Sequence, residues 1–173
     1  MSRRRAQALC TALGIMPATL AGRELPFHAE ARSLVPVGLG GDGRDKFLVA
    51  AAARAWRAMQ VAAAQDGVAL HLISAFRSYA FQASLIEVKL QRGRTLSEVL
   101  AINAPPGHSE HHTGRAIDIG TPGCAALDEA FADTPAFGWL QGHAPSHGFS
   151  LSYPRHNAQG FIYEPWHWCW RRH

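Results

Sequence analysis

One Ala-rich segment, residues 45–65, constrains the fold more than any other part of the sequence. Its apolar residues recur at steps of three and four, the period of an α-helix with one apolar face. Alanine also has the highest helix propensity, so the segment predicts a long helix. Asp66 and Gly67 end it, and residues 68–73 then alternate as a half-buried strand does. The periodic positions are Leu48, Val49, Ala52, Trp56, Met59 and Ala63.

The remaining segments mix helices and strands without an internal repeat. Further helices are expected over residues 6–13, 79–91, 96–102, 125–131 and 137–147. A strand is expected over 115–119, and segments 149–152 and 160–163 are expected to pair as a β-hairpin. Residues 1–44 are rich in Gly and Pro and predict a loop-rich lead-in packed on the core. Because no β-α-β unit recurs, we expect one α+β domain over 1–173, with a small central antiparallel sheet flanked by helices.

Charge and composition argue against nucleic-acid binding and against a membrane span. The chain has 173 residues, 47% of them hydrophobic, which suits one domain with its own core. Its 17 Lys and Arg are scattered apart from residues 3–5 and 171–172, whereas a nucleic-acid site needs a clustered basic face. No apolar run approaches the roughly 18 residues that span a bilayer. The N-terminus imitates a secretory signal, but Gly14 and Pro17 interrupt it, so we expect a cytoplasmic monomer, with a periplasmic or secreted protein as the alternative.

Cysteine and histidine usage differ in what they indicate. Cys10, Cys124 and Cys169 are odd in number and lack C-x-x-C spacing, so they predict free thiols. A thiol hydrolase using Cys124 or Cys169 stays an alternative, although neither lies in a recognisable nucleophile motif. Ten histidines are the more informative excess, because imidazole is a common zinc ligand and proton shuttle.

Two segments concentrate the residues that a hydrolytic metal site needs. They are residues 109–118 (SEHHTGRAID) and residues 164–167 (EPWH). A catalytic zinc takes three His or carboxylate ligands and keeps one position open for water. A histidine of the first segment, Asp118 and His167 meet that number. Glu164 is then left over as a general base, a role that needs a carboxylate near the metal.

These segments resemble the zinc D-Ala-D-Ala carboxypeptidase family of the vancomycin-resistance type, part of the wider group that includes lysostaphin-like metallopeptidases. The likeness consists of Ser-x-His-x-x-Gly-x-Ala-x-Asp followed downstream by Glu-Pro-Trp-His. It extends back to Ser-Ala-Phe-Arg-Ser-Tyr at residues 74–79. The resemblance implies a hedgehog-like α+β fold and hydrolysis of the terminal D-Ala-D-Ala bond of peptidoglycan stem peptides or precursors.

The resemblance also implies that His111, Asp118 and His167 bind zinc and that Glu164 is the catalytic base. It selects His111 over its neighbour His112, because the family's ligand comes directly after Ser-Glu. Successive side chains of an extended backbone point to opposite faces. We therefore expect His112 to support a ligand or to face the substrate.

Three further positions match residues that act on the substrate in the family. Arg77 matches an arginine that stabilises the developing oxyanion, while Ser109 and Gln82 match positions that contact substrate. Ser152 and Cys169 depart from the pattern, because relatives often carry Arg at both positions, and this leaves the exact substrate open. We expect a zinc D,D-carboxypeptidase acting on peptidoglycan peptides. The alternatives are a peptidoglycan endopeptidase, a D,D-dipeptidase and a zinc-binding module without catalysis.

Overall fold

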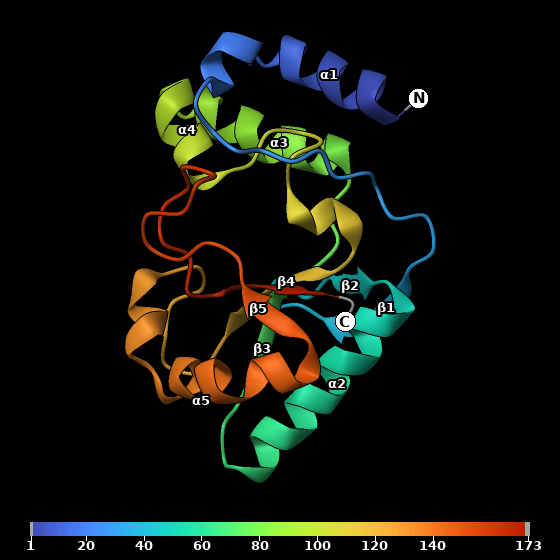
Figure 1. The fold of residues 1–173 in the computed structure, drawn as a ribbon, viewed down its shortest axis with the longest axis vertical. Helices are drawn as coiled ribbons and strands as arrows, with labels where there is room; N and C mark the ends of the chain where they lie inside the picture. Colours follow the sequence, from blue (N-terminus) through green and yellow to red (C-terminus); the bar gives the residue numbers. More distant parts are fainter. Residues whose placement is uncertain (1, 172–173) are drawn as a thin grey trace.

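The computed structural model describes residues 2–171 (Figure 1). A four-stranded antiparallel sheet has the order β3 (His71–Ser74), β4 (Ala116–Gly120), β6 (His167–Trp170) and β5 (Phe149–Leu151). A second, two-stranded sheet pairs β1 (Val35–Leu39) with β2 (Asp45–Leu48). The α-helices are α1 (Ser2–Ala12), α2 (Ala50–Gln65), α3 (Tyr79–Gln91), α4 (Leu96–Ile102) and α5 (Pro135–His143). Short 3₁₀ helices are η1 (Pro17–Leu20), η2 (Glu110–Thr113), η3 (Glu129–Asp133) and η4 (Ala144–His147).

Helices lie on both sides of the four-stranded sheet, with α2 and α5 below it and α1, α3 and α4 above it in the view of Figure 1. The lower layer holds the main core, where Ile117 and Ile119 of β4 join Trp56 of α2 and Leu140 of α5. Burial of each such side chain contributes roughly 1.5–3 kcal/mol. Because side chains alternate along a strand, the same strand turns Asp118 toward the upper side. None of the described helices is long and apolar enough to cross a bilayer.

The upper layer has its own smaller core and is tied to the His-rich segment. Cys10 of α1, Ile86 of α3 and Val99 of α4 are buried together there. The chain between η1 and β1 then runs along η2, where the Ala31 amide donates a hydrogen bond to the His112 carbonyl (2.8 Å). The N-terminal segment therefore helps to hold the turn that carries the histidines.

The α+β class is confirmed, as are the helices expected over 79–91 and 96–102. The helix expected over 45–65 begins only at Ala50, because residues 45–48 form β2 and pair with β1. Leu48 fits the helical period, but it is equally buried as a strand residue. The strand β1 falls in the segment predicted to be rich in loops. Pro36 and Gly38 belong to the Gly and Pro content on which that prediction depended. A two-stranded ribbon accepts both, since the pairing is irregular between these two residues.

The expected hairpin is wrong, because residues 160–163 form no strand and β5 pairs with β6 instead. The side chain of Asn157 accepts from the Phe161 amide (3.1 Å) and donates to the Phe161 carbonyl (2.9 Å). These bonds satisfy the backbone locally, so the segment needs no strand partner.

The helix expected over 125–131 is also wrong, since only the 3₁₀ helix η3 forms nearby, at Glu129–Asp133. Thr134 caps a new helix that begins at Pro135. That helix, α5, ends at His143 rather than at His147, because Pro145 disfavours a continuing α-helix and the chain tightens into η4. The helix expected over 6–13 begins earlier, at Ser2.

Candidate metal centre and active site

Three side chains from three different elements meet on the upper side of the sheet. Asp118 on β4 and His167 on β6 are direct partners across the two strands, and His111 comes from η2. Asp118 Oδ1 lies 3.0 Å from His167 Nδ1, and Asp118 Oδ2 lies 3.2 Å from His111 Nε2. One ligand atom of each residue lies within 4.8 Å of the others, and all three residues are buried. Among the described residues this is the group of His, Cys, Asp or Glu side chains that could hold a metal ion.

The hydrogen bonds of the His111 ring leave one nitrogen free for an ion. His111 Nδ1 lies 2.6 Å from the carbonyl oxygen of Ala75, which can only accept, so Nδ1 carries the hydrogen. His111 Nε2 is buried without a hydrogen-bond partner. A buried nitrogen lone pair of this kind is costly unless an ion or a donor occupies the space beside it. Two imidazoles and a carboxylate are also the ligand set that catalytic zinc prefers, so these residues fit a zinc ion.

The charges of the three residues also suit a cation. The pKa of Asp118 is lowered well below its ordinary range, because both histidines and Arg77 outweigh the effect of burial. Burial alone would lower the pKa of His167, but hydrogen bonds to Asp118 and Glu110 outweigh it and raise that pKa to about 10. Burial lowers the pKa of His111 to about 4. The metal-free site therefore holds a proton on His167, and a bound cation would take the place of that proton.

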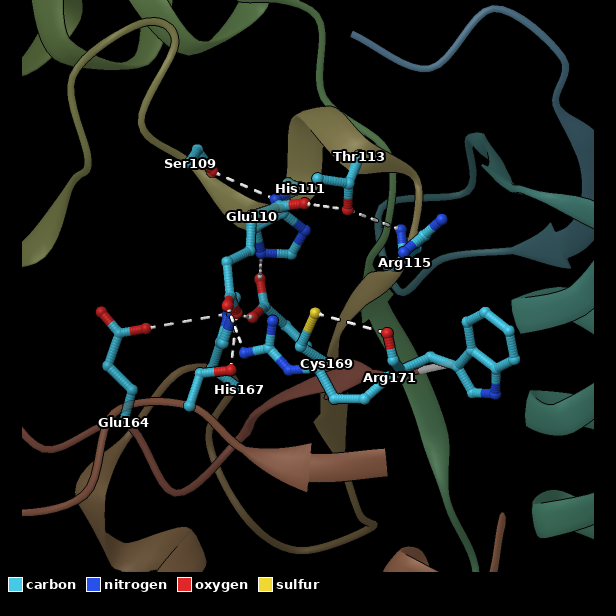
Figure 2. A network of polar contacts seen from close by, with 12 residues as sticks. Ser109, Glu110, His111, Thr113, Arg115, Glu164, His167, Cys169 and Arg171 are labelled. Carbon is cyan, nitrogen blue, oxygen red and sulfur yellow. Dashed lines mark hydrogen bonds and ion pairs between the residues drawn. The ribbon is translucent and has the colours of Figure 1, made fainter. Parts of the chain in front are cut away.

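Glu164 and Arg77 border the three ligands, as expected. Glu164 Oε2 lies 3.9 Å from His167 Nδ1, and Figure 2 shows this carboxylate reaching toward the His167 ring from the left. Burial raises the pKa of Glu164 to about 7, which is the range in which a carboxylate exchanges protons efficiently near neutral pH. Arg77 Nη2 donates to Asp118 Oδ2 at 2.9 Å, while Arg77 Nε is buried without a hydrogen-bond partner. That unused N–H is available to an oxygen of a ligand in the site.

Ser109 and Gln82 are close to the site, but each already has a contact within the protein. Ser109 Oγ accepts from the His111 amide (3.3 Å) and so caps η2. Gln82 Oε1 accepts from Arg77 Nη1 (3.2 Å), and its Nε2 donates to the Ala104 carbonyl (2.9 Å). Gln82 therefore holds Arg77 in place. Both side chains also line a cavity of about 30 Å³ beside the ligands. Their contact with substrate stays a prediction.

His112 faces away from the metal ligands, but not for the reason expected from an extended backbone. Residues 110–113 form the 3₁₀ helix η2, whose tight turn separates the two histidines. His112 Nδ1 lies 2.7 Å from the Arg77 carbonyl, and His112 Nε2 accepts from the Gly107 amide at 3.1 Å. His112 is fully buried and fastens the backbone of Arg77 to the His-rich turn.

A cleft of about 620 Å³ opens onto the site, and several of its residues were missed by the sequence analysis. Arg77, Asp118 and Glu164 line the end of the cleft at the metal ligands. The rest is lined mainly by apolar side chains and by the ammonium of Lys89, which donates to Asn103 Oδ1 at 3.0 Å. The four-residue spacing of the cleft residues on α3 is the signal that could have revealed them, because it places them on one helix face behind Arg77. The cleft residues on α3 are Phe81, Leu85 and Lys89.

The thiol groups have surroundings that do not suit a nucleophile. Each of the three contacts a main-chain carbonyl: Cys10 that of Pro106, Cys124 that of Ala125 and Cys169 that of Trp170. Burial raises the pKa of Cys169 to about 12, which keeps it protonated at neutral pH. The geometry therefore favours metal chemistry over a thiol mechanism.

Comparisons with known proteins agree with this geometry. The family model VanY, described as D-alanyl-D-alanine carboxypeptidase, matches residues 45–173. The protein YodJ of Bacillus subtilis (strain 168), which is named as a carboxypeptidase, is 38% identical to this chain over 121 residues. The matched residues are 67% of this chain and 43% of YodJ. The chain thus spans less than half the length of this curated relative.

Two solved structures share the fold. The LdcB LD-carboxypeptidase superposes with a TM-score of 0.73 at 30% identity, over 84% of this chain and 71% of that one. The vancomycin-resistance D,D-pentapeptidase VanY of a VanB-type cassette, solved in complex with Zn(II), superposes with a TM-score of 0.62 at 22% identity, over 84% of this chain and 82% of that one. Because the family model covers well over half of the chain and includes every residue of the metal centre, the chain belongs to the VanY family of D-alanyl-D-alanine carboxypeptidases.

Proposed function

We propose that the protein is a zinc-dependent D,D-carboxypeptidase that releases D-alanine from peptidoglycan peptides ending in D-Ala-D-Ala. The observation that carries this proposal is the buried set of His111, Asp118 and His167, with Glu164 and Arg77 at its border. The description of the family and the Zn(II) bound by the VanY pentapeptidase support the choice of reaction and metal. A module that only binds zinc would need neither Glu164 nor Arg77.

Each residue has a separate task in the proposed hydrolysis. Bound zinc would polarise the scissile carbonyl and make an attacking water more acidic. Glu164, whose pKa burial raises to about 7, takes the proton from the water and returns it to the amine of the departing D-alanine. The buried Arg77 N–H without a partner is in place to donate to the oxygen on which negative charge develops. Asp118 and Gln82 hold the Arg77 guanidinium in that position.

The two cavities suggest how a peptide would lie across the site. The cavity of about 30 Å³ beside Ser109 and His111 has room for a small side chain such as the methyl group of alanine. The cleft of about 620 Å³, which shares Arg77 and Glu164 with that cavity, has room for the rest of a peptide. This arrangement suits an enzyme that removes one small terminal residue.

A second candidate is an L,D-carboxypeptidase, because LdcB, at 30% identity, carries that activity in its name. A pentapeptide ending in D-Ala-D-Ala and a tetrapeptide ending in one D-Ala after an L-centre separate the two. Mass spectrometry should detect D-alanine loss from the pentapeptide but not from the tetrapeptide. The reverse result would replace the D,D assignment by the L,D assignment.

The same assay tests the metal and the base. Release should stop with a chelator and return with zinc, and zinc-loaded Glu164→Ala should bind one zinc without releasing D-alanine. Release that is indifferent to the chelator would contradict the metal mechanism. Zinc binding without release from either peptide would favour an endopeptidase or a binding module.

A further inference from the structure

Glu110 is a buried carboxylate beside the metal ligands, and the family resemblance assigns it no role. Its side chain is only 9% exposed. Oε2 accepts from Ser152 Oγ at 2.5 Å and lies 3.1 Å from His167 Nε2, while Oε1 accepts from Arg171 Nη2 at 2.6 Å. Figure 2 shows the carboxylate between the His167 ring and the Arg171 guanidinium. A buried carboxylate is costly unless it is paired in this way, so its partners hold it in one orientation.

The two nitrogens of the His167 ring have different surroundings. Nδ1 faces Asp118 Oδ1 at 3.0 Å, on the side where His111 also presents its free nitrogen. Nε2 faces Glu110. A neutral imidazole carries one hydrogen, and an ionised carboxylate can only accept, so Glu110 favours the tautomer with hydrogen on Nε2. That tautomer leaves a lone pair on Nδ1, which is the nitrogen that reaches the ion.

We infer that Glu110 is a positioning residue that fixes the tautomer and the ring orientation of His167 for metal binding. The inference rests on the zinc site of the proposed function. A carboxylate that accepts from the outer nitrogen of a metal-bound imidazole also makes the ring a better electron donor. Glu110 cannot itself replace a ligand in this orientation, because it lies on the side of the ring opposite Nδ1.

Ser152 and Arg171 hold Glu110 from two strands of the sheet. Ser152 follows β5, and Arg171 follows β6 on the same side of the strand as His167, because side chains alternate. The Arg171 amide donates to the Gly148 carbonyl at 2.8 Å, which fixes the backbone at this point. Arg171 also offsets the charge of Glu110, because its Nη2 lies 2.6 Å from Glu110 Oε1.

The test compares zinc binding and His167 tautomer in three variants of the full chain. Glu110→Ala removes the acceptor, Glu110→Gln keeps its size but removes its charge, and Glu129→Ala removes an exposed glutamate that pairs with Arg155 on the surface. Competition with a chromogenic chelator gives the zinc affinity. Long-range proton–nitrogen spectra of zinc-loaded, histidine-labelled protein report which nitrogen of His167 carries the hydrogen. The folded state is checked by circular dichroism.

Glu110→Ala should bind zinc about 10–100-fold more weakly than wild type, and Glu110→Gln should show a smaller loss. Glu129→Ala should match wild type. The nitrogen spectra should show hydrogen on Nε2 of His167 in both zinc-loaded proteins, but the resonance of that hydrogen should move upfield in Glu110→Ala, because the carboxylate that accepts from it is gone. Wild-type zinc affinity in both Glu110 variants, or an unchanged resonance of the Nε2 hydrogen in Glu110→Ala, would overturn the inference. If Glu110→Ala does not fold, Glu110→Gln decides alone.

These measurements need no substrate. Failure of the wild type to release D-alanine would therefore contradict the proposed function without touching the inference about Glu110. Failure to bind zinc at all would overturn both, and a loss of binding that is equal in Glu110→Ala and Glu129→Ala would overturn the inference alone.

Discussion

Replacing Glu164 with Gln is expected to stabilise the metal-free protein at neutral pH and to slow hydrolysis by the zinc-loaded protein. Glu164 is 9% exposed, and burial is the largest cause of the rise in its pKa from 4.5 to about 7; His167 opposes the rise and Asp118 adds to it. The unfolded state therefore releases this proton at lower pH than the folded state does. Stability falls as the pH rises from 4.5 to 7, and each unit costs about 1.36 kcal/mol. The loss at pH 8 approaches about 3 kcal/mol.

Gln has nearly the same shape as Glu but does not ionise, so Glu164→Gln should escape this loss. For a chain of this size 1 kcal/mol corresponds to about 2–4 °C, so the metal-free variant should unfold roughly 6–12 °C above wild type at pH 8. Below pH 4.5 the two should coincide, because wild-type Glu164 is then protonated in both states. Scanning calorimetry in a chelator from pH 4 to pH 8 measures the difference. Glu87→Gln, at an exposed position of α3, is the matched control.

The reasoning is refuted if metal-free Glu164→Gln is no more stable than wild type at pH 8, because burial would then not disfavour the carboxylate. Zinc should reduce the difference, since a nearby dication favours the ionised form of Glu164. With zinc bound, hydrolysis by the variant should fall by about 10²–10⁴-fold, the usual contribution of a general base. Stability and activity should thus move in opposite directions at this one position.

Three further predictions concern the turn, the metal and the arginine. Gly114→Ala should lower the free energy of unfolding by roughly 1–3 kcal/mol in urea titrations. Gly114 has a φ of +64°, and an added Cβ would lie 2.8 Å from Leu34 Cδ2. The control Gly142→Ala should not be destabilising, because nothing lies within 4 Å of the added carbon. Zinc at 1,000 times its Kd should raise the free energy of unfolding by about 4 kcal/mol, and a thermal shift that survives in His111→Ala would contradict the assigned ligand. Arg77→Lys should lower kcat while zinc affinity measured by calorimetry is retained, because lysine cannot keep both contacts of the guanidinium; an unchanged kcat would exclude the proposed role.

The metal centre could be predicted because short motifs carry its residue types in a fixed order. His111, Asp118 and His167 do meet, although they come from a turn and two strands. Glu110 could not be assigned in this way. Its role depends on His167 lying across the sheet beside it, and no local pattern reports that distance.

The errors in secondary structure arise where other contacts, some local and some distant in the sequence, override a simple periodic pattern. Residues 45–48 fit the helical period of the segment that follows, yet pairing with 35–39 makes them a strand. Residues 160–163 look like a strand, yet Asn157 satisfies the backbone at Phe161. His112 was expected to point away from His111 because the backbone was taken to be extended. The two side chains do diverge, but in a 3₁₀ turn. The first correction follows from a strand partner outside the segment, whereas the other two follow from short-range contacts that simple periodicity does not report.

The two histidines would offer opposite ring nitrogens to a bound ion, because His111 Nε2 and His167 Nδ1 are the nitrogens that face Asp118. His167 stands directly across the sheet from Asp118, where side chains of paired strands lie about 4.5–5.5 Å apart, so its near nitrogen, Nδ1, reaches the ligand set. His111 comes from η2 and presents its far nitrogen, Nε2. Each ring then needs an acceptor at its other nitrogen, which is a main-chain carbonyl for His111 and Glu110 for His167. A slip of β6 by one residue would place Trp168 opposite Asp118, so the metal centre exists only in this register of the sheet.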